Sequence, residues 1–164
     1  RFKHGELYSA DSIHFNDSLR CYTLRKHRTV YGGGGIMPDV FVPLDTTQYT
    51  AFHRQLVARS LVINTTLRYV EDHRDELKTK YAKFDDYMKR FEVPQAMVDT
   101  LFAEAERQKV KPRDDAERKR TLPMLRLQLK ALIARDIWDM NEYFRLMNEQ
   151  NHIVSKAVEV ITGK

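Results

Sequence analysis

Six histidines and one cysteine are the side chains in this sequence best suited to bind a metal ion. The histidines are His4, His14, His27, His53, His73 and His152. Zinc sites place such ligands at short spacings such as HxxxH, HExxH or CxxC, and none of these spacings occurs. The single Cys21 also excludes an internal disulfide. The sequence therefore predicts no metal site.

Serine and carboxylate side chains are the next candidates for chemistry. No GxSxG elbow surrounds any serine, so the sequence indicates no activated nucleophile of that kind. Two carboxylate pairs occur, Asp85/Asp86 and Asp114/Asp115, but both stand near predicted helix starts, where the helix macrodipole favours acidic side chains. We therefore assign no catalytic residue to this sequence.

Four consecutive glycines at positions 32–35 could let backbone N–H groups close around a phosphate. A phosphate loop needs Lys and Ser/Thr directly afterwards, whereas Ile36, Met37 and Pro38 follow here. Proline also lacks the N–H group that a helix N-terminus would contribute. A structural turn that requires positive φ is the favoured interpretation, and no cofactor is predicted.

A basic stretch between Arg107 and Lys130 holds nine Lys/Arg against three Asp/Glu. Such a segment can bind nucleic acid, anionic lipid or an acidic protein. No Phe, Tyr or Trp interleaves it, which weakens an interpretation as a single-strand binding site. A solvated helix face is favoured, with a partner surface as the alternative. The residues of this possible partner surface, called the basic surface below, are Arg107, Lys109, Lys111, Arg113, Arg118, Lys119 and Arg120.

The 164 residues are enough for one domain, or for one domain with an appendage. Hydrophobic residues make up 42% and charged residues 31%, a balance typical of a folded chain rather than a disordered one. The longest apolar runs cover only a few residues, so no membrane span is predicted within the sequence. The formal net charge of +5 is a mild excess and does not by itself indicate a nucleic-acid partner.

The 127 residues from Ile36 to Thr162 contain no glycine, which helices tolerate poorly, and most of this part is predicted to be helical. A first helix is expected to begin near Thr46 or Thr47, with a break near Ser60. Its apolar face is predicted from a spacing of three and four residues. That face comprises Leu56, Ser60, Ile63, Leu67 and Val70. A separate short helix is expected around residues 75–81.

The next two predicted helices are separated by a proline. An aromatic face indicates the first of them, and Pro94 is expected to open the second after an extended Val93. The aromatic face comprises Phe84, Tyr87, Met88 and Phe91. The buried stripe of the second helix comprises Met97, Val98, Leu101, Phe102 and Ala105, and this helix should end by residues 109–112.

The C-terminal third contains the longest apolar stripe, which predicts the central helix. Asp114 and Glu117 have the spacing of a capping box at a helix start, and Pro123 is expected to cause a kink or restart at Leu122. The stripe comprises Leu125, Leu129, Leu132, Ile133, Ile137, Met140, Phe144 and Met147. Asn151 and Gly163 are expected to cap the two ends of a last helix.

The first 45 residues differ from the rest, because β-forming residues dominate several short segments there. We predict strands at residues 19–24, 29–31 and 40–42, with a weaker candidate at residues 10–16. Such short strands make a marginal sheet on their own and are expected to lie against the helices or another neighbour. The sequence thus predicts a mainly α protein. A β-rich segment (residues 1–45) precedes a bundle of about six helices (residues 46–164).

One string carries a resemblance to a known family. YGGGGIMPD, followed by VFVP, resembles the segment that closes the peptidase core of carboxyl-terminal processing proteases, also called tail-specific proteases, in the type found in Bacteroidetes. The preceding turn at residues 24–28 departs from that family, with Leu24 in place of a common Pro and His27 in place of a Gly. The signature residues are Tyr31, Gly32, Gly33, Gly34, Gly35, Ile36, Pro38 and Asp39. Residues 127–140 and 69–77 resemble the long C-terminal extension of the same proteins.

The resemblance implies an exported serine endopeptidase that cleaves proteins near their C-termini with a Ser nucleophile and a Lys base. In that family both catalytic residues and a PDZ domain precede the signature, so this chain would be the non-catalytic part after them. It would scaffold the core or mediate contacts with substrates, partners or a second copy, in the periplasm or cell envelope. The alternative is a free-standing basic helical module that binds nucleic acid or an acidic protein.

Overall fold

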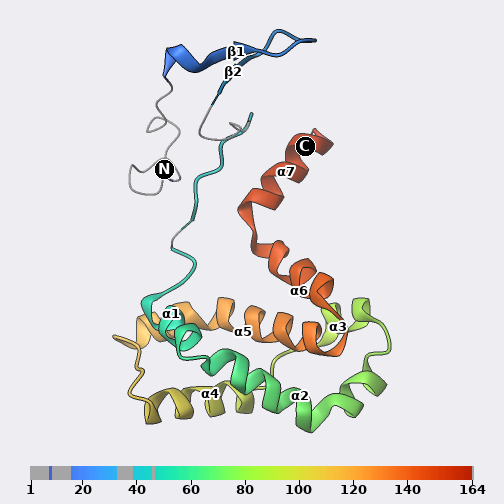
Figure 1. The fold of residues 1–164 in the computed structure, drawn as a ribbon. Coiled ribbons are helices and arrows are strands. Elements are labelled where there is room, and N and C mark those ends of the chain that lie inside the picture. Colours follow the sequence, from blue (N-terminus) through green and yellow to red (C-terminus); the bar gives the residue numbers. More distant parts are fainter. Residues whose placement is uncertain (1–7, 9–15, 33–38, 46, 164) are drawn as a thin grey trace. The chain divides into compact units, whose positions relative to one another are not determined.

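The computed structural model describes residue 8 and residues 16–32, 39–45 and 47–163. The chain divides into two compact units, residues 1–46 and 47–164. The described residues are mainly helical, with one small antiparallel sheet in the first unit, so the predicted fold class is confirmed (Figure 1). The elements are η3 (Asp17–Leu19), β1 (Arg20–Tyr22), β2 (Thr29–Tyr31), α1 (Ala51–Ala58), α2 (Leu61–Lys80), α3 (Phe84–Arg90), α4 (Gln95–Arg107), α5 (Asp115–Ile137), α6 (Met140–Met147), η4 (Asn148–Gln150) and α7 (His152–Thr162).

The first unit contains a two-stranded hairpin. β1 pairs with β2 in the register Arg20 to Tyr31 and Tyr22 to Thr29. The turn between the strands is held by Thr23, whose N–H donates to the Arg28 carbonyl at 3.0 Å and whose Oγ1 accepts from the Arg28 N–H at 3.0 Å. The predicted strands around residues 19–24 and 29–31 are therefore confirmed.

The other two strands predicted in this unit have different outcomes. Residues 40–42 form no strand, and no described segment pairs with them. Pro43 follows them directly and cannot donate a ladder hydrogen bond, which limits strand pairing here. The weaker candidate at residues 10–16 lies outside the described residues except for Asn16, whose side chain caps η3.

The helical unit begins later than predicted. Thr50, rather than Thr46 or Thr47, caps α1 by accepting from the His53 N–H. The break near Ser60 is confirmed, since Ser60 adopts φ 58° between α1 and α2. That left-handed residue rotates α2 relative to α1, so Leu67 is exposed and Thr66 is buried instead. α2 then continues to Lys80, and the separate helix expected at residues 75–81 does not exist.

α3 and α4 agree with the sequence prediction. Phe84, Tyr87 and Phe91 are buried and form one aromatic cluster with Trp138 and Tyr81. Tyr87 and Phe91 stack, whereas Trp138 and Tyr81 meet the cluster edge-on or tilted. Pro94 immediately precedes α4, whose buried side chains include the predicted Met97, Val98, Leu101 and Ala105. Aromatic packing of this kind fixes α3 against the end of α5.

α5 is the central helix. Asp114 caps its start by accepting from the Glu117 N–H at 2.7 Å, so the predicted helix start is confirmed. The predicted restart at Pro123 does not occur, and the helix runs through it to Ile137. A proline removes one hydrogen bond there, and buried side chains on either side, Thr121 before it and Leu125 after it, stabilise the helix across it.

The predicted apolar stripe through Met147 is divided between two helices. Trp138 leaves the helical conformation and Asp139 caps a new helix by accepting from the Asn141 N–H at 2.7 Å. Met140 and Phe144 are consequently about half exposed rather than buried. The structure differs from the prediction because Asp139 begins a new helix that runs in another direction. Residues spaced three or four apart share one face only within a single helix.

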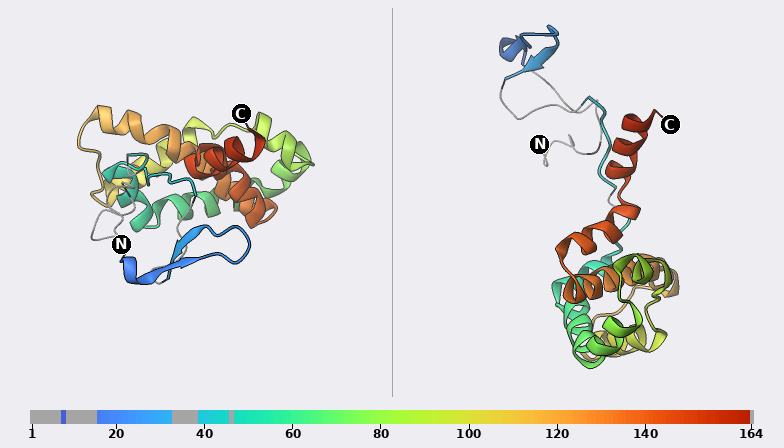
Figure 2. Two further views of the ribbon diagram at one scale, coloured as in Figure 1. Left: turned by 90° about the horizontal axis from the view of Figure 1, so that it is seen from above. Right: turned by 90° about the vertical axis from the view of Figure 1, so that its right-hand side faces the viewer.

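The core of the second unit lies around α5, which packs against α1, α2 and α6, while α2 also packs against α4 (Figure 1). Figure 2 shows α6 and α7 leading away from the body formed by α1 to α5. Asn151 and Gly163 cap α7 as predicted. Its apolar residues Ile153, Val158 and Ile161 are exposed. No helix in the described parts of the chain is long and apolar enough to cross a membrane.

Candidate binding groove

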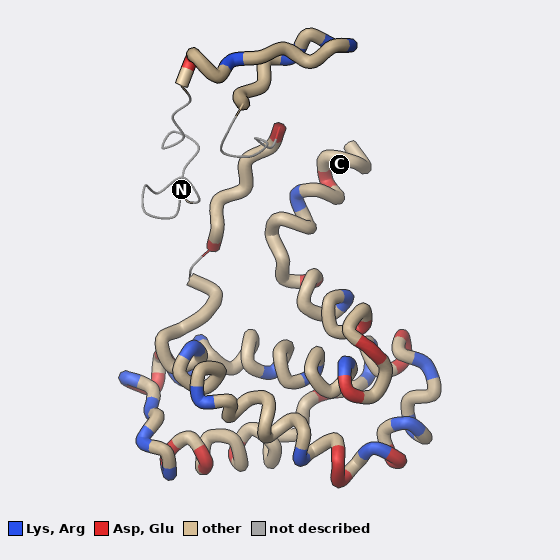
Figure 3. The backbone as a smooth tube through the Cα atoms, viewed as in Figure 1, with Lys and Arg blue, Asp and Glu red and all other residues tan. Residues whose placement is uncertain are grey.

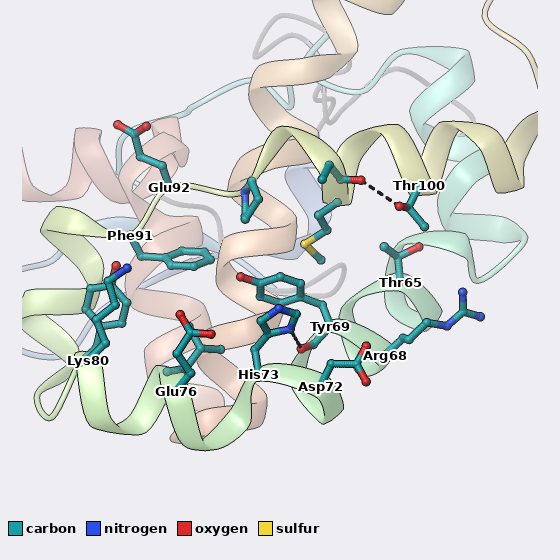
Figure 4. A pocket seen from close by; sticks show the side chains of 15 residues that line it. Thr65, Arg68, Tyr69, Asp72, His73, Glu76, Lys80, Phe91, Glu92 and Thr100 are labelled. Atoms are coloured by element: carbon teal, nitrogen blue, oxygen red, sulfur yellow. Dashed lines mark hydrogen bonds between the residues drawn. The ribbon is translucent and has the colours of Figure 1, made fainter.

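A groove of about 550 Å³ runs along one face of α2 and is closed on its other side by residues 91–94 and the first turns of α4. We call it the α2–α4 groove. Its α2 wall comprises Thr65, Arg68, Tyr69, Asp72, His73, Glu76, Leu77 and Lys80, with Tyr81 just beyond the helix. Its other wall comprises Phe91, Glu92, Pro94, Ala96, Met97 and Thr100 (Figure 4). This volume is within the range of ordinary ligand sites.

Helix periodicity brings the first wall together, because residues three or four apart share one face of α2. The second wall is held from α5. One Arg126 Nη1–H donates to the Val93 carbonyl at 2.7 Å, and its other nitrogen bonds to the Gln95 side chain. Arg126 thereby positions the extended segment before α4. The groove is thus formed by three elements rather than by one motif.

Tyr69 and His73 form the centre of the α2 wall. Their rings stack with centroids 4.3 Å apart, and His73 Nδ1 lies 2.9 Å from the Tyr69 carbonyl oxygen. A carbonyl only accepts, so Nδ1 carries the proton, and a neutral His73 has its acceptor at Nε2. Burial first, and the nearby Glu76 and Tyr81 second, raise the pKa of Tyr69. Its hydroxyl therefore stays protonated and neutral near pH 7.

Charged side chains follow the groove at intervals of one helical turn. Along α2 the order is Arg68, Asp72, Glu76 and Lys80, that is basic, acidic, acidic and basic. Glu92 adds a third carboxylate on the other wall, where Figure 4 shows it across from Glu76 with Phe91 between them. Within the described part of the chain, none of these five side chains has an ion-pair partner within 4.0 Å. Their charges are therefore available to a ligand.

One hydroxyl of the groove has a local role. The Thr100 hydroxyl on α4 donates to the Ala96 carbonyl at 2.9 Å within its own helix, and no base is bonded to it. The described residues also contain no group of three or more His, Cys, Asp or Glu that could hold a metal ion. The arrangement can bind a ligand through an apolar floor and charged rim.

The basic surface lies elsewhere, at the connection between α4 and α5, where Figure 3 shows a concentration of Lys and Arg. The structure brings all seven predicted residues to this end of the helical unit. Several are paired with acidic neighbours: Arg107 with Glu104 at 2.8 Å, and Lys111 with Glu106 at 2.9 Å.

Other basic side chains in this region have local roles. Arg113 contacts Asp114 at 3.0 Å, and the Arg118 guanidinium lies 5.0 Å from the centre of the Phe102 ring. Such pairing reduces the positive potential of the surface and favours the interpretation as a solvated face.

The signature segment is described only at its ends. Tyr31 is the last residue of β2, the Gly32 N–H donates to the Leu19 carbonyl at 2.7 Å, and Asp39 pairs with Arg28. The predictions for Gly33, Gly34, Gly35, Ile36 and Pro38 fall outside the described residues.

Sequence reasoning missed the groove altogether. We expected a separate helix to begin near Asp75, which divided the charged residues between two helices. In the structure one face of one helix carries all four: Arg68, Asp72, Glu76 and Lys80. The repeat of charges every four residues over positions 68–80 was the signal that could have shown a continuous, solvent-facing stripe. The opposite wall has no comparable signal, because packing against α5 sets its position.

A second polar cluster lies buried between α1 and α5. Glu117 accepts from the Phe52 N–H at 3.1 Å and from the Arg113 N–H at 2.7 Å, and these two bonds lower its pKa. Thr121 donates to the Glu117 carbonyl at 2.7 Å, and its oxygen lies 2.6 Å from the Thr50 hydroxyl. The cluster ties the start of α1 to the first turns of α5. Its role is structural, because its described polar contacts are internal.

Residues 52–139 match the model of a family of unknown function, DUF8443, which covers more than half of the chain. The chain belongs to this family. The DUF8443 match begins within α1 and ends after α5, so it contains the whole α2–α4 groove and the basic surface. The first unit, α6, η4 and α7 lie outside it. No curated protein and no solved structure matches the chain.

Proposed function

We propose that this DUF8443 chain is the non-catalytic C-terminal part of an exported serine endopeptidase that cleaves proteins near their C-termini. We further propose that its helical unit binds a polypeptide segment in the α2–α4 groove. The peptidase and PDZ domains would precede it in the same protein, and the periplasm or cell envelope is the expected location. This part of the proposal is supported by the resemblance of the YGGGGIMPD string and its continuation, and of residues 69–77 and 127–140, to tail-specific proteases.

The groove is the observation that carries the binding role. It combines an apolar floor, including Phe91, Pro94 and Met97, with charged side chains that form no ion pair within 4.0 Å in the described part of the chain. Ligand sites typically have this composition, in which apolar area provides affinity and a few polar groups provide orientation. From Arg68 to Lys80 the groove follows α2 over twelve residue-to-residue steps, about 18 Å at a rise of 1.5 Å each. An extended peptide of about five residues has the same length.

The hairpin of the first unit supports an attachment to a neighbouring domain. Tyr22 and Val30 are exposed on its strands, Leu19 is exposed at the end of η3, and no residue of the described part of this unit is buried. Two strands with both faces exposed are marginal in water, and a further sheet or domain surface would bury these side chains. The peptidase core is the neighbour that we propose.

The binding role is tested by selecting displayed random dodecapeptides on the purified chain and measuring the affinity of the enriched sequences by fluorescence anisotropy. Ala96→Trp fills the groove from α4, and Ala103→Trp is its matched control, because Ala103 is also exposed on α4 but lies outside the groove. We expect binding to the parent chain and to Ala103→Trp, with at least tenfold weaker binding to Ala96→Trp. No enrichment, or equal affinity for both variants, would overturn the binding role.

The assignment to a peptidase has a separate test in the coding sequence upstream of Arg1. An upstream frame that encodes an export signal, a PDZ region and a Ser/Lys pair would support the assignment. An upstream frame without a peptidase, or a start codon directly before the Arg1 codon, would overturn the assignment and favour a free-standing helical module.

A further inference from the structure

The order of charges along the α2–α4 groove restricts what can occupy it. The two acidic side chains, Asp72 and Glu76, lie at its centre, and the two basic ones, Arg68 and Lys80, lie toward its ends. Lys80 is in part engaged already, since its Nζ lies 5.7 Å from the centre of the Tyr81 ring. A complementary occupant therefore has positive charge at its middle.

The floor beneath these carboxylates is aromatic and apolar. Tyr69 and His73 stack between Asp72 and Glu76 on α2, and Phe91 faces them from the other wall (Figure 4). Met97 also lines that wall. Lysine and arginine side chains combine a long apolar stem with a charged end, and they bind well where an apolar surface borders a carboxylate. Neither a purely apolar side chain nor an acidic one matches both features.

Charge also disfavours two other occupants. A second copy of α2 laid antiparallel would place Arg68 opposite Lys80 and Asp72 opposite Glu76, with like charges in both pairs. A parallel second copy would place each charge opposite itself, which is equally repulsive. Nucleic acid would meet the acidic centre with its phosphates, and that contact is unfavourable.

We propose that the α2–α4 groove binds a polypeptide segment through a central lysine or arginine, whose stem lies on the aromatic floor and whose charge lies between Asp72 and Glu76. This inference rests on the proposed polypeptide-binding role of the helical unit and specifies the chemistry of its partner. Glu92, on the opposite wall, adds a third carboxylate to the groove.

The test uses the full chain and three degenerate peptide mixtures of the form acetyl-X-X-Lys-X-X-amide, with norleucine or glutamate replacing Lys in the second and third. Norleucine keeps the apolar stem and removes the charge. Binding is followed by the amide shifts of Tyr69, His73 and Phe91 in ¹⁵N-labelled protein. We expect shifts that saturate with the lysine mixture, about tenfold weaker binding of norleucine, and none of glutamate.

Two double variants test whether the preference for lysine over norleucine depends on the carboxylates of the groove. Asp72→Asn with Glu76→Gln removes the central carboxylates, and Glu71→Gln with Asp75→Asn makes the same change on exposed positions of α2 outside the groove. We expect the first pair to abolish the preference for lysine over norleucine, and the second pair to keep it. Added salt should weaken lysine binding and leave norleucine binding nearly unchanged.

The outcomes separate this inference from the proposed function. Equal binding of the lysine and norleucine mixtures to the groove would overturn the cationic anchor and leave a polypeptide-binding groove in place. Loss of preference in both double variants would also overturn the anchor, because the effect would then be a general one of net charge. Binding of none of the mixtures or displayed peptides would overturn the binding role itself.

Discussion

His53 is buried between α1 and α5, with 1% of its surface exposed, and its two ring nitrogens have different surroundings. Nε2 lies 2.7 Å from the Gln128 Oε1, an acceptor, so Nε2 carries the proton. Nδ1 is buried without a hydrogen-bond partner in the described structure. Protonation would place a charge and a donor at Nδ1 with no acceptor. Burial accordingly lowers the pKa of His53, and the bond to Gln128 only partly opposes this.

His53 should therefore make the stability of the helical unit depend on pH. The unfolded chain takes up the proton at about pH 6.5, whereas the folded chain resists it, so the unfolded state binds more protons below that pH. Stability should fall as pH decreases from 7 through 6.5 toward the lower folded pKa. Urea unfolding between pH 5 and 8 measures this slope. His53→Gln should reduce the slope. A wild-type stability independent of pH between 5 and 7 would contradict the prediction.

Lys109 adopts φ 59° immediately after α4, a left-handed conformation that glycine takes without strain. The Val110 N–H donates to the Ala105 carbonyl at 2.8 Å, as in a Schellman motif, and the Val110 side chain is buried. Lys109 thus has a backbone constraint in addition to its place in the basic surface. The sequence shows the charge of Lys109 but not its left-handed backbone, because that φ depends on how α4 ends.

Lys109→Gly should stabilise the chain by up to about 1 kcal/mol, because removal of the Cβ relieves more strain than the added flexibility of the unfolded chain costs. Lys111→Gly is the control: it removes the same charge, together with the ion pair to Glu106, at a residue without positive φ, and it should lower the stability. Thermal unfolding followed by circular dichroism measures both. A loss of stability in Lys109→Gly equal to that in Lys111→Gly would show that the left-handed residue is not strained.

At the scale of the elements, apolar spacing predicted most helices but not where their phase changes. The aromatic face of α3 and the buried stripe of α4 were visible because each lies within one uninterrupted helix. The break near Ser60 was predicted, but its left-handed conformation was not, because no glycine marks the position. The end of α5 at Trp138 was not predicted, because it falls in the middle of an apolar stripe. In both cases tertiary packing outweighs local propensity.

The groove was beyond sequence reasoning for a related reason. Its two walls lie at residues 65–81 and 91–100, and neither contains a motif. They face each other because α2 and α4 pack together and because Arg126 of α5 holds the backbone at Val93. A hydrogen bond between residues 33 positions apart leaves no local pattern. The charged stripe of α2 could be predicted once its continuity was known, whereas the opposite wall could not.

At the scale of the whole molecule, the absence of glycine between Ile36 and Thr162 was sufficient to predict a helical part and a different N-terminal part. The apolar face of α7 shows the limit of such patterns. The capping residues Asn151 and Gly163 predicted this helix correctly, but its apolar residues Ile153, Val158 and Ile161 are exposed. An amphipathic pattern indicates a helix with an apolar face, and only the structure shows whether that face is covered.

Every buried apolar side chain of the described chain lies between Phe52 and Leu146, so the hydrophobic core belongs to the second unit. Deletion of residues 1–46 should therefore leave the thermal midpoint of residues 47–164 within about 4 °C of the full chain, a change that corresponds to about 1 kcal/mol at this size. Leu129→Ala is the control, because it removes a fully buried side chain of α5 and should cost about 2–5 kcal/mol in both forms. Differential scanning calorimetry measures the midpoints. A larger decrease in the shortened chain would mean that the first unit contributes directly to the stability of the helical unit, and the hairpin would then be stabilised by these helices rather than by the proposed peptidase core.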